Sequence, residues 1–201
     1  MTRFTYVYDT YCGWCYGASP VIDALIESGA DVTVMHRHLF QGANAHRMGD
    51  GFGKMALQYD RRIEQLTGQE FSDAYVQNIL GNPDEVLDSG LTAQAAALVH
   101  DLGAKAEIKL ARTLQRARYV DGISARNSDV VRKALAEFGV ELSLEDGKDQ
   151  ARKISAEAAN LQASIGAQGV PTLLKHTSGK TTQVNISTYY ELPEEIAALA
   201  A

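Results

Sequence analysis

The feature that most constrains this chain is the segment 11–17, with the sequence YCGWCYG, because it holds both cysteines of the 201 residues, Cys12 and Cys15. Aromatic residues at every second position of residues 4–8 predict a strand before it. Apolar residues at helical spacing over 18–27 predict a helix after it. The two cysteines therefore lie where a strand turns into a helix.

This position has chemical consequences for the two thiols. The first turn of a helix presents unpaired N–H groups and the positive end of the helix dipole, and both favour an anion such as a thiolate. Cys12 is the outer thiol and the predicted nucleophile. Cys15, three residues later, can attack the same sulfur and release whatever Cys12 has bound, so we expect an attacking and a resolving thiol.

Composition narrows the classes of protein that fit. With 45% hydrophobic residues the chain can bury a core without disulfide bonds. Its net charge of −6 and the absence of a basic cluster argue against a nucleic-acid partner. The sequence contains no apolar run long enough to span a membrane. Residues 1–3 lead into a strand without the apolar stretch and cleavage site of a secretory signal, so we expect a cytoplasmic protein. There, a lone Cys-x-x-Cys is more often catalytic or metal-binding than structural.

The order of the other elements predicts the fold. A second strand follows near residues 32–35, only helices are expected over 42–149, with Ser128 capping one of them, and a long helix begins near residue 151 and ends at Gly166. Strands then return at 172–175 and 181–186 around a Ser178-Gly179 turn. This order predicts an α/β, thioredoxin-like fold with an inserted all-helical lobe. We expect a discontinuous thioredoxin-like domain, 1–41 and 150–201, and a helical insertion, 42–149.

Several polar residues have alternative interpretations. Asp9 is interpreted either as a proton acceptor for Cys15 or as a group that bonds the amides of the turn, and turn bonding is favoured. His36 and His38 lie on one face of a strand and are the near pair that a zinc site with the cysteines would use, but this spacing is atypical for zinc. Arg61 and Arg62 are interpreted either as binding an acidic substrate or the glutathione carboxylate or, by default, as part of a solvated helix face. The other basic residues of the insertion are predicted to form an exposed stripe: Lys105, Lys109, Arg112, Arg116 and Arg118.

A set of motifs spread over nearly the whole chain resembles the DsbA family of thioredoxin-like proteins, most closely its cytoplasmic, FrnE-like branch. The motifs are Tyr8-Asp9, Cys12-Gly13-Trp14-Cys15-Tyr16-Gly17, Arg62-Ile63, Gly68-Gln69, Phe71, Gly166 and Gly169-Val170-Pro171-Thr172. The resemblance implies a thiol–disulfide oxidoreductase or isomerase in which Cys12 is the nucleophile, Cys15 resolves the mixed disulfide and Pro171 is a cis proline. The backbone of Val170 would then pair with an extended substrate beside the sulfurs.

The remaining predictions concern substrates and partners. Trp14, between the cysteines, is predicted to lie at the rim of the substrate site. No cofactor or metal is required, and glutathione is expected as a redox partner alongside substrate proteins or small thiols and disulfides. The pattern points to no particular oligomeric state or direction of electron flow. The alternative function is that of a glutathione-dependent, kappa-like isomerase or transferase, whose members resemble this chain less because they typically carry a serine where Cys12 stands.

Overall fold

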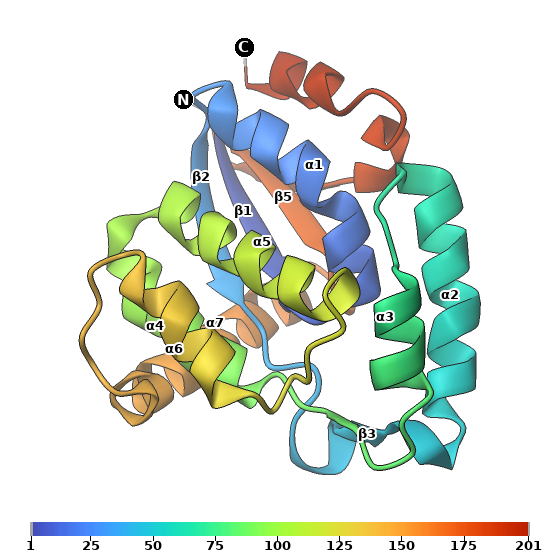
Figure 1. Ribbon diagram of the computed structural model, residues 1–201. Helices are drawn as coiled ribbons and strands as arrows, with labels where there is room; N and C mark the ends of the chain where they lie inside the picture. The colour runs from blue at the N-terminus through green and yellow to red at the C-terminus, as the bar shows by residue number, and fades with distance from the viewer. Residues whose placement is uncertain (1, 201) are drawn as a thin grey trace.

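A four-stranded sheet lies at the centre of the computed structural model, which describes residues 2–200 (Figure 1). The strands are β1 (Arg3–Tyr8), β2 (Asp31–His36), β5 (Thr172–Thr177) and β6 (Lys180–Val184), in the order β2-β1-β5-β6. β1 pairs with β2 in parallel and with β5 antiparallel, and β5 and β6 form a hairpin. The predicted strand, parallel crossover and hairpin are thus confirmed.

The crossover between β1 and β2 is the helix α1 (Gly13–Glu27), which begins directly after Cys12. β1 is a central strand, and its residues 4–8 are all buried. α1 packs against the C-terminal 3-10 segment η7 (Pro193–Leu199). Figure 1 shows α1 and α5 on the near side of the sheet. The helix α2 packs against the N-terminal half of α1. The carboxyl end of β1 therefore leads into a site bordered by helices.

Between β2 and β5 the chain is mainly helical. Its longer segments are α2 (Phe52–Thr67), α3 (Asp73–Tyr75) with the π-helical turn η3 (Val76–Leu80), α4 (Gly90–Val99) with η4 (His100–Leu102), α5 (Ala104–Tyr119), α6 (Ser128–Ala136), and η5 (Leu144–Gly147) leading into α7 (Lys148–Ser164). Short 3-10 turns also occur in this stretch at η1 (Gly42–Asn44) and η2 (Met48–Asp50). Another, η6 (Ile186–Tyr189), follows β6.

Two local predictions for this region are wrong. The insertion is not exclusively helical, because β3 (His46–Arg47) pairs antiparallel with β4 (Val86–Leu87). Each of these strands has only two residues, which is too short for the alternating hydrophobic pattern that predicts a strand. Asn127, not Ser128, caps α6, since its side chain accepts hydrogen bonds from the amides of Asp129 and Val130 at 3.1 and 3.3 Å. Both residue types are good caps, and the backbone conformation decides between them.

The helical segments have a hydrophobic core of their own, and the cysteine motif contributes to it. Tyr11 and Tyr16 belong to this cluster, whereas Cys12 and Cys15 belong to the cluster around the sheet. The ring of Tyr16 stacks on that of Tyr119 at 4.7 Å and meets Phe71 edge-on at 5.3 Å. The motif therefore lies at the junction of two cores, and the helical lobe packs directly on it.

Candidate active site

Cys12 occupies the N-cap position of α1. Its amide donates to the carbonyl oxygen of Asp9 at 3.1 Å, and its own carbonyl accepts from the amide of Tyr16 at 3.0 Å. No acidic side chain lies in the first turn of the helix. Cys12 therefore lies at the N-terminus of α1, where unpaired N–H groups and the positive end of the helix dipole meet no acidic side chain in that turn.

The two cysteines differ in access. Cys12 is 6% exposed and lines a cleft, whereas Cys15 is fully buried behind it, and neither forms a disulfide. Burial, together with the neighbouring Cys12, raises the pKa of the Cys15 thiol well above its ordinary value. A substrate in the cleft can reach Cys12 but not Cys15, which is the asymmetry that an attacking and a resolving thiol require.

The loop before β5 lies against the nucleophile. The Val170–Pro171 peptide bond is cis, as the family resemblance implied, and the Cys12 Sγ donates to the carbonyl oxygen of Val170 at 3.7 Å. Val170 lines the same cleft as Cys12, while Pro171 lines a neighbouring cavity of about 500 Å³ together with Trp14. The structure therefore brings all five predicted site residues together around the cysteines.

A buried glutamine that the sequence analysis missed holds this loop. Gln162 on α7 donates from Nε2 to the carbonyl oxygen of Gly169 and, at 2.9 Å, to the hydroxyl of Thr172. Its Oε1 accepts from Arg37, which follows β2. The sequence did contain a signal for its burial, because Gln162 lies four positions after Ala158 on the apolar face of the helical repeat.

The cleft above Cys12 has a volume of about 290 Å³ and mostly apolar or aromatic walls. It lies between the cysteine motif and the helical lobe, and Trp14 stands at the boundary between it and the second cavity. Its charged lining residues are Asp60 and Arg118. Both are buried, so the cleft combines apolar walls with two ionisable groups.

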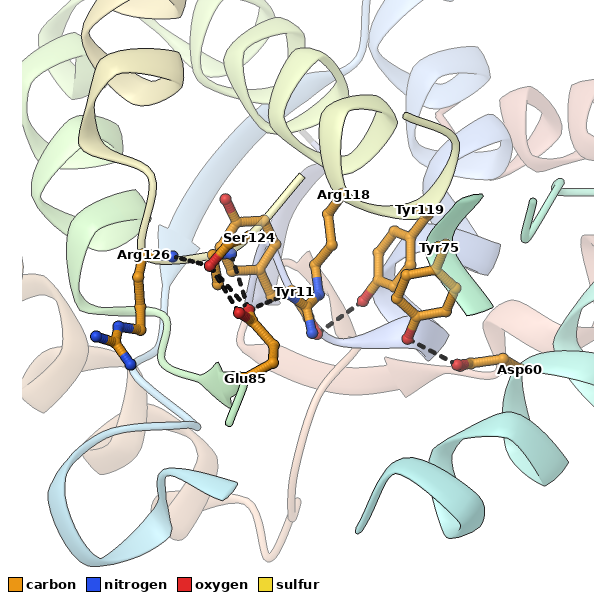
Figure 2. Close-up of polar contacts among 9 residues, drawn as sticks. Tyr11, Asp60, Tyr75, Glu85, Arg118, Tyr119, Ser124 and Arg126 are labelled. Atoms are coloured by element: carbon orange, nitrogen blue, oxygen red, sulfur yellow. Dashed lines mark hydrogen bonds and ion pairs between the residues drawn. The ribbon is translucent and has the colours of Figure 1, made fainter. Parts of the chain in front are cut away.

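The prediction that Arg118 belongs to an exposed stripe is wrong. Lys105, Lys109 and Arg116 are exposed, but Arg118 is 1% exposed. Its guanidinium lies 5.3 Å from the ring centre of Tyr11 and pairs with Glu85 across 3.5 Å (Figure 2). The spacing of Leu110, Leu114 and Arg118, four residues apart each time, placed Arg118 on the core face of α5.

Asp60 on α2 was also missed. It lies four residues after Ala56 and three before the buried Ile63, hence on the inward face of its helix. Its Oδ2 accepts from the hydroxyl of Tyr75 at 2.9 Å (Figure 2). Burial raises the pKa of Asp60 to about 7, against the opposing effects of the Tyr75 hydrogen bond and the Arg118 charge.

Gly13 is explained by the approach of α2. A Cβ at this position would lie 2.7 Å from Asp60 Oδ1 and 3.1 Å from the Cδ1 of Ile63. A larger residue here would have to displace these two side-chain ends, both of which line the cleft.

Asp9 is fully buried, and its carboxylate accepts from the amides of Tyr11 at 2.9 Å and Leu39 at 3.0 Å. Burial raises the pKa of Asp9 to about 6. These contacts support the turn-bonding interpretation and add a link to the segment after β2.

The expectation that His36 and His38 share one face of a strand is wrong, because β2 ends at His36 and His38 follows it. The rings of His36 and His38 are 5.5 Å apart. Within residues 2–200, no group of three or more His, Cys, Asp or Glu side chains has an arrangement that could hold a metal ion. Over the same range, every helix falls short of the length or the apolar character needed to cross a membrane.

Comparisons with known proteins agree with this geometry. Residues 5–185 match the family described as DSBA-like thioredoxin domain. The structure is similar to the cytosolic disulfide reductase DsbM from Pseudomonas aeruginosa, with 28% identity, a TM-score of 0.85, and coverage of 98% of this chain and 95% of that one.

The same Pseudomonas aeruginosa protein with glutathione matches with 29% identity, a TM-score of 0.83, and coverage of 98% and 96%. The DsbA of Proteus mirabilis with a bound peptide shares the fold, with 14% identity, a TM-score of 0.52, and coverage of 99% and 84%. The search of curated proteins gave no match.

Proposed function

Because this chain belongs to the DSBA-like thioredoxin domain family and is a thiol–disulfide oxidoreductase, we propose that Cys12 and Cys15 carry its reaction. The observation that carries the proposal is the accessible thiol of Cys12 at the helix N-terminus with the buried thiol of Cys15 behind it. In the reductive direction, the Cys12 thiolate attacks one sulfur of a disulfide, which breaks that bond and forms a mixed disulfide. Cys15 then loses its proton and attacks Cys12, which releases the second substrate thiolate and leaves a Cys12–Cys15 disulfide.

We further propose that the protein acts in the cytoplasm, within the FrnE-like branch, on small disulfides or exposed cysteines of proteins. The description of the Pseudomonas aeruginosa relative as a cytosolic disulfide reductase supports this location and direction. The structure of that relative with glutathione supports glutathione as the thiol that returns the Cys12–Cys15 pair to the reduced form. Gly13 and Trp14 add no charge between the cysteines, which supports a less oxidising pair than one with a histidine there. No further cofactor enters this cycle.

A redox titration tests the proposal. Trp14 is the single tryptophan of the sequence and lies between the cysteines, so its fluorescence should change when they form a disulfide. In glutathione buffers we expect one two-electron transition that the variants Cys12→Ser and Cys15→Ser both lack. A midpoint near about −270 mV supports a reductase, and one between about −120 and −180 mV an oxidant or isomerase.

A kappa-like, glutathione-dependent isomerase or transferase is the second candidate, because the cleft of about 290 Å³ is of a size for a small molecule. This reaction needs one thiol instead of two. Turnover of a small aromatic substrate by Cys15→Ser with glutathione would favour it. Trapping of a stable mixed disulfide on Cys12 in the same variant, without such turnover, favours the dithiol mechanism.

A further inference from the structure

The carboxyl group of Asp60 has one oxygen occupied and one facing the cysteine motif. Oδ2 accepts from Tyr75, and no hydrogen bond within residues 2–200 engages Oδ1. Oδ1 lies only 2.7 Å from the place that a Cβ on Gly13, the neighbour of Cys12, would take. Asp60 and Cys12 line the same cleft. Asp60 therefore lies against the first turn of α1 and on the wall of the cleft that a disulfide attacked by Cys12 would enter.

The groups around Asp60 allow it to exist in both protonation states. Tyr75 from the segment of α3 and Arg118 from α5 act on its carboxyl group, which in turn acts on Tyr119 of α5. The other ionisable groups of the same cleft are Tyr11, Cys12 and Tyr59. Burial favours the neutral acid, whereas the Tyr75 hydroxyl and the Arg118 charge favour the carboxylate. The balance places the pKa of Asp60 at about 7. A group with such a pKa can give and take a proton at neutral pH.

The proposed exchange reaction needs such a group. When Cys12 opens a disulfide of an aliphatic thiol, the departing sulfur is a strongly basic thiolate, since the pKa of such thiols is about 8.5. The cleft around it is mostly apolar, and its lining cation, Arg118, already pairs with Glu85, so this anion is stabilised poorly there. A proton donor beside Cys12 would remove that penalty.

We propose that Asp60 is a catalytic acid–base residue that protonates the thiolate leaving from a small disulfide; this inference rests on the proposed function. The substrate S–S bond breaks as the Cys12–substrate bond forms, and the proton passes from the Asp60 carboxyl to the leaving sulfur, so that a neutral thiol departs. In the reverse step, the Asp60 carboxylate takes the proton of an entering thiol, which then attacks the mixed disulfide. No external oxidant or reductant is needed for either exchange.

Two disulfides with different leaving groups test this role. Glutathione disulfide releases a basic thiolate, whereas dithiobis(nitrobenzoate) releases an aromatic thiolate that departs without a proton. The reduced wild-type protein and Asp60→Asn are mixed with each, and the rate constant of mixed-disulfide formation on Cys12 is measured from pH 5 to pH 9. Asn keeps the size of the side chain and an oxygen that accepts from Tyr75.

Glu107 provides a matched control. It is a buried carboxyl that also accepts from a tyrosine hydroxyl at 2.9 Å, that of Tyr8, but it does not line the cleft. We expect Asp60→Asn to slow the reaction with glutathione disulfide about 100-fold and to remove a decline in rate above about pH 7. The reaction with dithiobis(nitrobenzoate) should be unchanged, and Glu107→Gln should change neither the ratio of the two rates nor the pH profile.

The possible results distinguish a failure of the acid–base role of Asp60 from a failure of the proposed dithiol function. Equal slowing of both reactions by Asp60→Asn, or no slowing of either, would overturn the acid–base role. If Glu107→Gln reproduced the selective loss, the effect would belong to the fold and the role of Asp60 would again be overturned. Failure of the wild-type Cys12 to react with either disulfide would overturn the proposed function itself.

Discussion

The contact between α1 and α2 depends on the missing side chain of Gly17. A Cβ at this position would lie 2.6 Å from the Cγ2 of Ile63 and 3.2 Å from the Cγ2 of Thr67. Ile63 is 1% exposed and branched at its Cβ, so its methyl group cannot easily turn away. The same helix carries Asp60, and hence the wall of the Cys12 cleft.

Two opposing effects determine the result of Gly17→Ala. Alanine in place of glycine inside a helix stabilises it by up to about 1 kcal/mol. Forcing an extra methyl group into a closed contact typically costs about 1–3 kcal/mol. We therefore expect a net loss of about 1 kcal/mol in the free energy of unfolding, measured by urea denaturation of the reduced protein with far-ultraviolet circular dichroism. For a chain of this size, that corresponds to a decrease of about 2–4 °C in Tm.

A second substitution identifies the contact responsible. Ile63→Leu removes the methyl group at Cγ2 and keeps the side-chain volume, so it should cost less than about 1.5 kcal/mol alone. In the Gly17→Ala background it should recover part of the lost stability, which gives a favourable coupling energy of about 0.5 kcal/mol or more. If Gly17→Ala stabilises the protein, or if the two changes are additive, the steric argument is refuted.

Two further predictions concern buried polar contacts. Gln162→Met keeps the length of the side chain but removes its hydrogen bonds with Gly169, Thr172 and Arg37, so that the Gly169 carbonyl keeps only the bond from the Thr172 hydroxyl. The unfolding free energy should fall by about 1–3 kcal/mol, and mixed-disulfide formation on Cys12 should slow. An unchanged rate would show that Gln162 does not position the loop. The Nδ1 of His100 donates to the Glu107 carboxylate, and this hydrogen bond raises the pKa of His100. The stabilisation from this pair is therefore complete below about pH 6.5 and is lost as pH rises through the folded-state pKa of His100. His100→Gln should therefore cost more stability near pH 6.5 than at pH 9 in urea titrations, and equal losses would contradict this coupling.

The local elements of the fold were predictable because each has a periodic pattern of its own. Alternating aromatic residues over 4–8 indicated β1, and the helical repeat after Cys15 indicated α1. The Ser178-Gly179 pair indicated the β5–β6 hairpin. The division at residues 42 and 149 stays a prediction. Short features without a pattern, such as β3 and the choice of Asn127 as a cap, were not predictable.

The candidate site was predictable where its residues are close in sequence. The spacing of Cys12 and Cys15 at a strand-to-helix junction indicated the chemistry of an attacking and a resolving thiol. Pro171, about 160 positions away, required the family resemblance, because a cis peptide bond is rare and has no periodic signal.

The sequence by itself therefore determined the order of the elements and the chemistry of the cysteine pair, since both depend on neighbouring residues. Only the tertiary structure decided what surrounds that pair. It turns Asp60 and Arg118, which look like ordinary charges on helices, into buried groups of one cleft, and it makes Gly13 the point where α2 approaches Cys12. The physical reason is that burial and proximity set the pKa of a carboxyl group, and both arise from contacts between segments far apart in the chain.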